Sequence, residues 1–302
     1  MTPLERIKYT SLFLLVLTIS ITILLYPSII ATIGGLKVKR MEIVLGITLP
    51  YGKQFLTLLT FILLLNLFPL TFYTYKSSKI KETMFRNIAP LLRDAASLIK
   101  PGLTFPKLLE ELTKRDYGPL NYYIERVYML SLSGYDFPEA FGKGMKGVPS
   151  SILRYLQVLV EAYLSGGKAA EVLGEASKFF LEFYSFEEMR ERTLKAYIYI
   201  VAMAILIFLI SITLILFFSQ TLVSAGGGAP MARVLTDEEI IAIAFYTSII
   251  ISVFGGLMLG KIIKGEISGG IHYTYLFMCL SLIYILFSDE VVRFLSGFIR
   301  TP

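Results

Sequence analysis

The chain has 302 residues, of which 55% are hydrophobic, and its mean hydropathy is +0.67. This composition is too apolar for an ordinary soluble domain. Lys and Arg outnumber Asp and Glu by 29 to 23, an excess that in so apolar a chain points to membrane topology and acidic partners rather than to nucleic acid. A single cysteine, Cys279, excludes an internal disulfide and a cysteine-based metal site, and a single histidine, His272, leaves no histidine cluster. We therefore expect no cofactor and no metal.

Five stretches of the chain are long and apolar enough to cross a bilayer, which takes about 20 residues. They cover residues 11–33, 55–75, 196–223, 240–260 and 271–287, and none has a charge in its interior. The first follows Arg6 and Lys8 as a signal peptide would, but its length of about 23 residues predicts an uncleaved anchor. The fifth is short, and Asp289 and Glu290 separate it from "VVRFLSGFI", which we predict to lie at the membrane interface.

A polar segment, residues 76–195, lies between the second and third apolar stretches and is 120 residues long. It contains 18 of the 29 basic residues and 15 of the 23 acidic residues, as expected of a water-exposed domain of ordinary size. The sequence therefore predicts three parts: two transmembrane helices in 1–75, a soluble domain in 76–195 and three further transmembrane helices in 196–302.

The pattern of the segment 76–195 is helical throughout. Apolar residues recur with a period of about 3.6 in stretches that begin at Met84, Leu120, Ile152 and Val172. No run of alternating residues indicates a strand. The sequence thus predicts an all-α, polytopic membrane protein whose soluble domain is a helical bundle.

Three glycines mark a repeat within this bundle. Gly102, Gly134 and Gly166 follow one another at intervals of 32 residues, in "LIKPGLTFPKLLEEL", "LSLSGYDFPEAFGKG" and "AYLSGGKAAEVLGEA". Gly takes the left-handed conformation that ends a helix at low cost. The three glycines are therefore the predicted corners of three αα-hairpins, which together make a six-helix bundle.

The residues after the first two corners are suited to starting the next helix. Thr104 and Asp136 are good N-cap types, and Pro106 and Pro138 fall in the first turn, where a missing N–H does no harm. The third corner lacks both signals.

The last helix of the bundle is predicted to continue into the third apolar stretch. No Gly follows Gly174 until Gly226, and this segment contains no Pro. A helix that starts near Lys168 and includes the whole stretch would be a rod of about 80 Å. The alternative is a helix break near Thr193.

Lys and Arg near the ends of the apolar stretches set the predicted topology. Residues 76–93 carry five basic residues and the loop 261–270 has two Lys against one Glu, whereas the loop 225–239 has one Arg against three acidic residues. This places the first residues of the chain, the bundle and the loop 261–270 in the cytoplasm and the loop 225–239 outside the cell membrane. The loop 34–53 disagrees, because it must lie outside and yet carries Lys37, Lys39, Arg40 and Lys53.

Motifs of common enzymes are missing: the sequence has no Gly-rich phosphate loop, no HExxH and no GxSxG, so we predict that it is not an enzyme. No charged residue lies deep in an apolar stretch, where an ion-coupled carrier needs one. In the second stretch, Asn66 and Pro69 are interpreted as structural. In the fourth, Ser252, Gly256 and Gly260 form a row of small residues that allows close helix packing, either within the chain or between two chains.

Together these features resemble the type II secretion system F domain. The predicted bundle of hairpins at "LIKPG", "LSLSG" and "AYLSGG" is followed directly by a membrane stretch, and "PSSILRYLQVLVEAYLSGGKAAEVLGEASKFF" (149–180) is similar to the most recognisable segment of that family. The segment "GLMLGKIIKGEISGGIHYTYLF" (256–277) resembles the archaeal and Tad-like branch. The resemblance extends over about residues 84–280. Two departures favour the short, single-domain type: Tyr163 stands where many bacterial members carry Glu, and the chain has one bundle where many have two.

This resemblance implies a non-enzymatic platform protein of the cell membrane. Members serve type II secretion, type IV pili, Tad pili and the archaeal flagellum. Such a protein would be engaged by a cytoplasmic secretion ATPase, would help to lift pilin-like subunits from the membrane lipid, and would form a homodimer or a heterodimer with a paralogue.

Basic residues near the corners and ends of the hairpins are the candidate ATPase contacts, because the family implies an acidic ATPase surface there. They are Lys107, Lys114, Arg115, Lys143, Lys146 and Arg154. The alternative for each residue is that it belongs to a solvated surface and contacts no partner. The alternative function is a permease subunit of an ATPase-coupled transporter, which also needs a cytoplasmic coupling domain.

Overall fold

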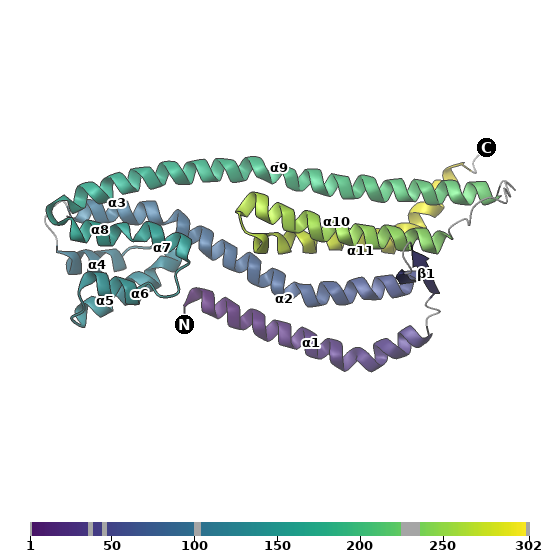
Figure 1. Cartoon of the computed structure of the whole chain (residues 1–302), viewed down its shortest axis with the longest axis horizontal. Coiled ribbons are helices and arrows are strands. Elements are labelled where there is room, and N and C mark those ends of the chain that lie inside the picture. The colour runs from purple at the N-terminus through teal and green to yellow at the C-terminus, as the bar shows by residue number, and fades with distance from the viewer. Residues whose placement is uncertain (1, 36–38, 44–46, 100–103, 225–235, 300–302) are drawn as a thin grey trace. The chain divides into compact units, whose positions relative to one another are not determined.

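The computed structural model describes residues 2–35, 39–43, 47–99, 104–224 and 236–299 (Figure 1). The chain divides into two compact units. The bundle unit comprises Met1–Thr10 and Tyr75–Thr193, and the second unit comprises Ser11–Thr74 and Leu194–Pro302. Three helices contribute residues to both units: α1 (Pro3–Gly35), α2 (Lys53–Arg86) and α9 (Ala169–Ser224).

The bundle unit consists of helices joined by short turns. After α2 come α3 (Ile88–Ile99), α4 (Phe105–Thr113), η1 (Gly118–Leu120), α5 (Asn121–Leu132), α6 (Phe137–Gly144), α7 (Ser150–Leu156), α8 (Val158–Leu164), η2 (Gly166–Lys168) and the first part of α9. The pairs α3–α4, α5–α6 and α8–α9 are the three predicted hairpins. The fifth predicted helix differs from expectation, since the chain breaks at Gln157 into α7 and α8, and apolar periodicity alone does not reveal such a break.

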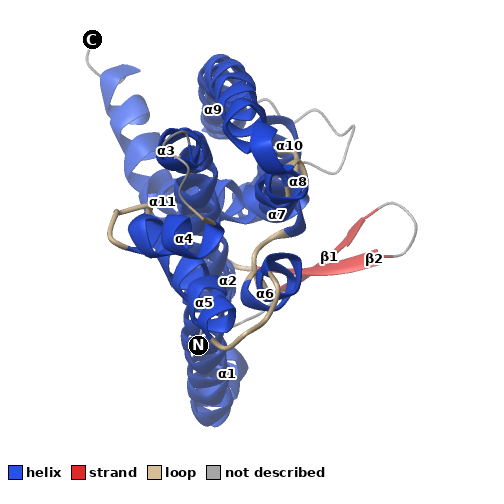
Figure 2. Cartoon of the chain, turned by 90° about the vertical axis from the view of Figure 1, so that its left-hand side faces the viewer, coloured by secondary structure: helices blue, strands red, loops and turns tan. Residues whose placement is uncertain are grey.

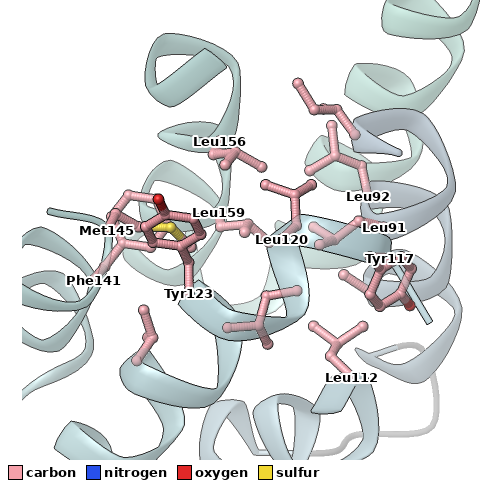
Figure 3. Packing of buried hydrophobic residues seen from close by; sticks show 14 of the residues in the cluster. Leu91, Leu92, Leu112, Tyr117, Leu120, Tyr123, Phe141, Met145, Leu156 and Leu159 are labelled. Carbon is pink, nitrogen blue, oxygen red and sulfur yellow. The ribbon is translucent and has the colours of Figure 1, made fainter. Parts of the chain in front are cut away.

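One hydrophobic core holds these helices together, and Figure 3 shows part of it. Leu91 and Leu92 of α3, Leu112 of α4 and Tyr123 of α5 are all at most 1% exposed. At the α2 side, the ring of Phe85 lies 5.6 Å from that of Tyr155 and 4.9 Å from that of Phe180. These rings join α2, α7 and α9.

The second unit adds α10 (Asp237–Lys264), η3 (Ile267–Gly270), α11 (Ile271–Ile299) and two strands, β1 (Lys39–Ile43) and β2 (Ile47–Tyr51). The strands pair antiparallel, with Lys39 opposite Tyr51, and stand out in Figure 2. The absence of strands was predicted only for the bundle, and this hairpin lies elsewhere, in the loop 34–53. The hydroxyl of Tyr246 in α10 donates a hydrogen bond to the carbonyl oxygen of Pro50 over 2.8 Å and so ties β2 to α10.

Five helices among the described residues are long and apolar enough to cross a membrane. Each contains one of the predicted stretches, so the chain is an all-α, multi-pass membrane protein. The fifth helix, α11, runs without a break from Ile271 to Ile299 and so includes "VVRFLSGFI". The location of that piece at the membrane interface stays a prediction.

The long final helix of the bundle is also present. α9 has 56 residues, from Ala169 to Ser224, and no break occurs near Thr193. The absence of Gly and Pro after Gly174 is the local reason, since neither the flexible nor the ring-constrained residue interrupts the backbone hydrogen bonds.

The small residues of α10 lie against the following elements of the same chain. A Cβ atom added to Gly256 would collide with the backbone and hydroxyl of Thr274, and one added to Gly260 would collide with the backbone of Gly270. Ser252 is fully buried, and its hydroxyl donates to the Ser248 carbonyl oxygen over 2.7 Å. This row was predicted to pack either within the chain or between two chains. Gly256 and Gly260 pack against other elements of the same chain.

Candidate functional site

The corners of the second and third hairpins lie at the same end of the bundle, which we call the corner end. Gly134 lies between α5 and α6 with a φ of +89°, and Gly166 lies between α8 and α9 with a φ of +58°. Both have the left-handed conformation. Gly102 lies outside the described residues.

Aromatic residues bring the three hairpins into contact at this end. The ring of Phe105, at the start of α4, lies 5.0 Å from that of Phe137, at the start of α6. The ring of Tyr163 in α8 is 5.0 Å from Phe105 and 5.2 Å from Phe137. Phe105 and Phe137 occupy equivalent places in the repeat, three residues after their corner glycines, so the repeat itself produces this cluster.

Thr104 and Asp136 occupy the N-cap positions of α4 and α6, with Pro106 and Pro138 in the first turns. Neither side chain makes the capping hydrogen bond that the sequence suggested. The Asp136 carboxylate instead accepts a hydrogen bond from the hydroxyl of Tyr163 over 2.7 Å. This bond to Asp136 raises the pKa of Tyr163. Tyr163 thus joins the third hairpin to the second.

Exposed apolar side chains surround this cluster. Leu132 at the end of α5 is 62% exposed, Leu164 at the end of α8 is 72% exposed, and Tyr135 between α5 and α6 is 38% exposed. Two of the candidate basic residues belong to the same end. Lys107 lies in the first turn of α4 and is exposed, and the ammonium of Lys143 lies 3.9 Å from the centre of the Tyr135 ring.

The other four candidates lie in or after the last turns of α4, α6 and α7. Lys114 and Arg115 follow α4, Lys146 follows α6, and Arg154 lies in α7; all four are exposed. The structure therefore does not gather the six basic residues into one patch but divides them into two groups.

Three of the six candidate basic residues already form ion pairs with nearby carboxylates. Lys143 forms an ion pair with Glu139 over 2.8 Å, and Lys114 forms ion pairs with Glu111 and Glu110 over 2.7 and 3.2 Å. Arg115 pairs with Asp94 over 2.8 Å. Hydrogen bonding to these carboxylates raises the pKa of Lys143, Lys114 and Arg115. Within the described part of the chain, no ion pair engages the side chains of Lys107, Lys146 or Arg154, so these three are the most available to a partner.

A polar network that the sequence did not reveal fixes the turn between α4 and α5. Asp94 of α3 accepts a hydrogen bond from the buried Tyr117 hydroxyl over 2.9 Å in addition to its ion pair with Arg115. Asn87 donates to the Tyr117 carbonyl oxygen over 2.9 Å, and Asn121 accepts from the Tyr117 N–H over 2.6 Å. Burial, followed by the bond to Asp94, raises the pKa of Tyr117 above its ordinary value. Asp94 and Tyr117 are 23 residues apart, a separation at which helical periodicity carries no information.

These surfaces are exposed and could contact a partner. No three His, Cys, Asp or Glu side chains in the described ranges are grouped so that they could hold a metal ion. The arrangement instead presents a rigid bundle with an apolar end and separate exposed cations.

Comparison with known families supports the resemblance drawn from the sequence. Residues 91–219 match the T2SSF family, described as "Type II secretion system (T2SS), protein F". The match begins in α3 and ends in α9, and so it includes the three corners and the helix that leaves the bundle. The resemblance of 256–277 to one branch lies beyond the match and stays a prediction. No curated protein and no solved structure matched the chain.

Proposed function

We propose that this multi-pass membrane protein, which is similar over residues 91–219 to protein F of type II secretion, is the membrane platform of a machine that assembles filaments of pilin-like subunits. In this role it couples a cytoplasmic secretion ATPase to the extraction and assembly of those subunits. The observation that carries the proposal is the family match, which extends from the bundle through α9 into an apolar segment.

The fold supports a mechanical role. α9 is one helix from the third hairpin to Ser224, and its second half is apolar enough to cross a membrane. The bundle unit, placed in the cytoplasm by the positive-inside rule, would receive movement from the ATPase, and α9 would pass it to the membrane. Pairing with a second copy or a paralogue is part of the same proposal.

The ATPase contact is proposed to use the exposed cations that lack ion-pair partners among the described residues, with the exposed apolar residues of the corner end. The side chains of Lys107, Lys146 and Arg154 are exposed. An acidic ATPase surface would complement them, because charges on opposite surfaces steer association and set its salt dependence. Lys114, Arg115 and Lys143 remain weaker candidates, because binding would first have to disrupt or share their present pairs.

Binding of the full chain in lipid nanodiscs to the secretion ATPase of the same cell tests this function. We expect saturable binding that weakens in about 0.5 M salt, where the Debye length is about 4–5 Å. Replacing Lys107, Lys146 and Arg154 together with Ala should weaken binding more than the control that replaces Lys114, Lys143 and Lys178, all three of which are paired.

Three results would contradict parts of this proposal. Absence of binding would oppose the platform role, and binding that does not respond to salt would oppose the charged contact. Stimulation of the ATPase by a small transported substrate, measured in liposomes, would instead favour the permease alternative.

A further inference from the structure

The start of α1 lies against the bundle, although residues 11–74 separate it from the bundle in sequence. Met1–Thr10 group with the bundle unit rather than with the rest of α1. Thr2 is only 5% exposed, which is unusual for a polar residue at the beginning of a helix. The beginning of α1 lies beside α5 in Figure 2.

Thr2 is seated between α5 and the turn that follows α6. A Cβ atom added to Gly147 would lie 3.1 Å from the Thr2 methyl carbon and 3.6 Å from the Tyr123 hydroxyl. Gly147 has a φ of +99°, a left-handed conformation that favours glycine. Because it has no side chain, it also leaves room for the methyl group of Thr2. The Tyr123 hydroxyl donates to the Gly147 carbonyl oxygen over 3.3 Å, and Tyr123 is fully buried. Burial raises the pKa of Tyr123.

Arg126, one turn further along α5, holds the same loop in place. Its guanidinium donates to the carbonyl oxygens of Lys146 and Lys143 over 3.2 and 3.4 Å. The hydrogen bond from the Thr2 backbone and, more weakly, the charge of Arg126 lower the pKa of Glu5 in α1. Tyr123, Arg126 and Gly147 therefore form a socket, which we define by these three residues.

The segment that enters this socket is preorganised. The Thr2 hydroxyl accepts from the Glu5 N–H over 3.1 Å, and the Glu5 carboxylate accepts from the Thr2 N–H over 2.8 Å. This reciprocal pair is a capping box, and Pro3 follows at the first helical position. The motif Thr-Pro-Leu-Glu was a readable sequence signal for the helix start, but it did not indicate the socket.

We propose that Thr2–Glu5 and the socket form a clasp that connects the first membrane helix to the α5–α6 hairpin without a covalent link nearby. α2 and α9 continue directly from bundle helices, whereas the start of α1 groups with the bundle unit through contacts between segments far apart in the sequence. Movement of the α5–α6 hairpin would thereby reach α1, and opening of the clasp would release it. The clasp rests on these contacts and does not require the proposed ATPase contact.

Hydrogen–deuterium exchange of the full chain in nanodiscs tests the clasp. Gly147→Leu fills the socket from the bundle side and leaves the Thr2–Glu5 capping box intact. We expect exchange in residues 3–10 to become faster by roughly tenfold, as for a segment that loses its packing. Gly134→Leu is the matched control, because Gly134 has a similar φ of +89° but no neighbouring atom within 4 Å. It should leave residues 3–10 unchanged.

A second variant guards against general damage by Gly147→Leu. Tyr123→Phe removes one hydroxyl from the socket and should also accelerate exchange in residues 3–10, while peptides of α3 stay protected. Unchanged exchange of residues 3–10 in both variants would overturn the clasp, and so would equal acceleration in the Gly134→Leu control. Binding of the ATPase, measured on the same samples, reports separately on the proposed function.

Discussion

Two glycines of α6 have opposite surroundings, although they are only two residues apart. A Cβ atom added to Gly144 would lie 2.9 Å from the backbone nitrogen and Cα of Val127 in α5, whereas one added to Gly142 would have no neighbour within 4 Å. Gly144→Ala should therefore lower the free energy of unfolding by about 1–3 kcal/mol through overpacking. Gly142→Ala should raise it by up to about 1 kcal/mol, because Ala favours a helix. Thermal unfolding of the bundle in nanodiscs would measure both, and equal effects would show that α5 and α6 do not approach at Gly144.

The hydroxyl of Tyr117 gives a second prediction at the scale of one residue. It is buried and donates to Asp94, so Tyr117→Phe should cost about 1–2 kcal/mol of bundle stability. Tyr163→Phe is the matched control, since it removes a similar bond to Asp136 at an exposed position and should cost less than about 1 kcal/mol. Amide exchange in the α4–α5 turn would report the difference. A larger effect at Tyr163 would mean that the corner end, rather than this turn, is the critical polar contact.

The same tyrosine predicts how the bundle responds to alkaline pH. Burial and then the bond to Asp94 raise the pKa of Tyr117 above its ordinary value of 10.0. The folded state therefore keeps its proton where the unfolded chain releases it, so the free energy of unfolding falls as pH rises above about 10 and is unaffected below it. Unfolding temperatures at about pH 9 and about pH 11 should differ less in Tyr117→Phe than in the unchanged chain. Equal losses would assign the alkaline response to other groups, such as the buried Tyr123.

At the scale of whole elements, the continuity of α9 is the feature on which the mechanical proposal depends. A Gly-Pro insertion after Lys195 should break the helix, because Pro costs about 3 kcal/mol in a helix interior. We expect filament assembly to be lost while the bundle stays folded, as judged by amide protection in α3 and α5. An Ala-Ala insertion at the same place keeps the helix but rotates its membrane half relative to its bundle half, so it separates continuity from register. Normal filaments from the Gly-Pro variant would refute the lever.

Elements of this fold were predictable to the extent that their signals are local. Five apolar stretches, the hairpins and the unbroken α9 all follow from composition, periodicity and the placement of Gly and Pro. The contacts between distant segments were not predictable in this way. The approach of Gly144 to Val127, the bond from Tyr117 to Asp94 and the seat of Thr2 depend on packing, which a single sequence does not encode at a fixed spacing. The strands β1 and β2 were missed because each has only five residues, too few for a clear alternating pattern.

The candidate site was predictable in kind but not in arrangement. Corner glycines and basic residues could be read from the repeat, yet their division into two groups depends on which way each helix runs. The sequence also could not show that two of the basic residues already form ion pairs. Lys114 pairs with Glu110 and Glu111, and Arg115 pairs with Asp94. The pairs of Lys114 with Glu110 and Glu111 have spacings that are common on helix surfaces and are worth little individually. Arg115 and Asp94 are far apart in the sequence and meet only in the fold.

At the scale of the whole molecule, the orientation in the membrane is the outstanding prediction. The two ends of α10 make a matched pair, because Glu238 and Ser268 are both exposed and lie before and after one apolar helix. In a chain that carries Cys279→Ser, we expect a membrane-impermeant thiol reagent to label Glu238→Cys in intact cells and Ser268→Cys only after permeabilisation. The reverse result would invert the topology and place the bundle outside, where no cytoplasmic ATPase could reach it.

Lys39→Cys, tested in the same way, addresses the one basic loop that conflicts with the positive-inside rule. The loop 34–53 separates α1 from α2, and both helices are apolar enough to cross the membrane. If both cross, this loop lies opposite the bundle, so we expect labelling of Lys39→Cys in intact cells together with Glu238→Cys. Its cations then act too weakly to invert the two flanking helices, whose orientation would be set by the basic residues at the start of α1 and at the end of α2. Labelling only after permeabilisation would mean that α1 and α2 do not both cross, and the clasp would then join the bundle to a helix that lies on the membrane surface.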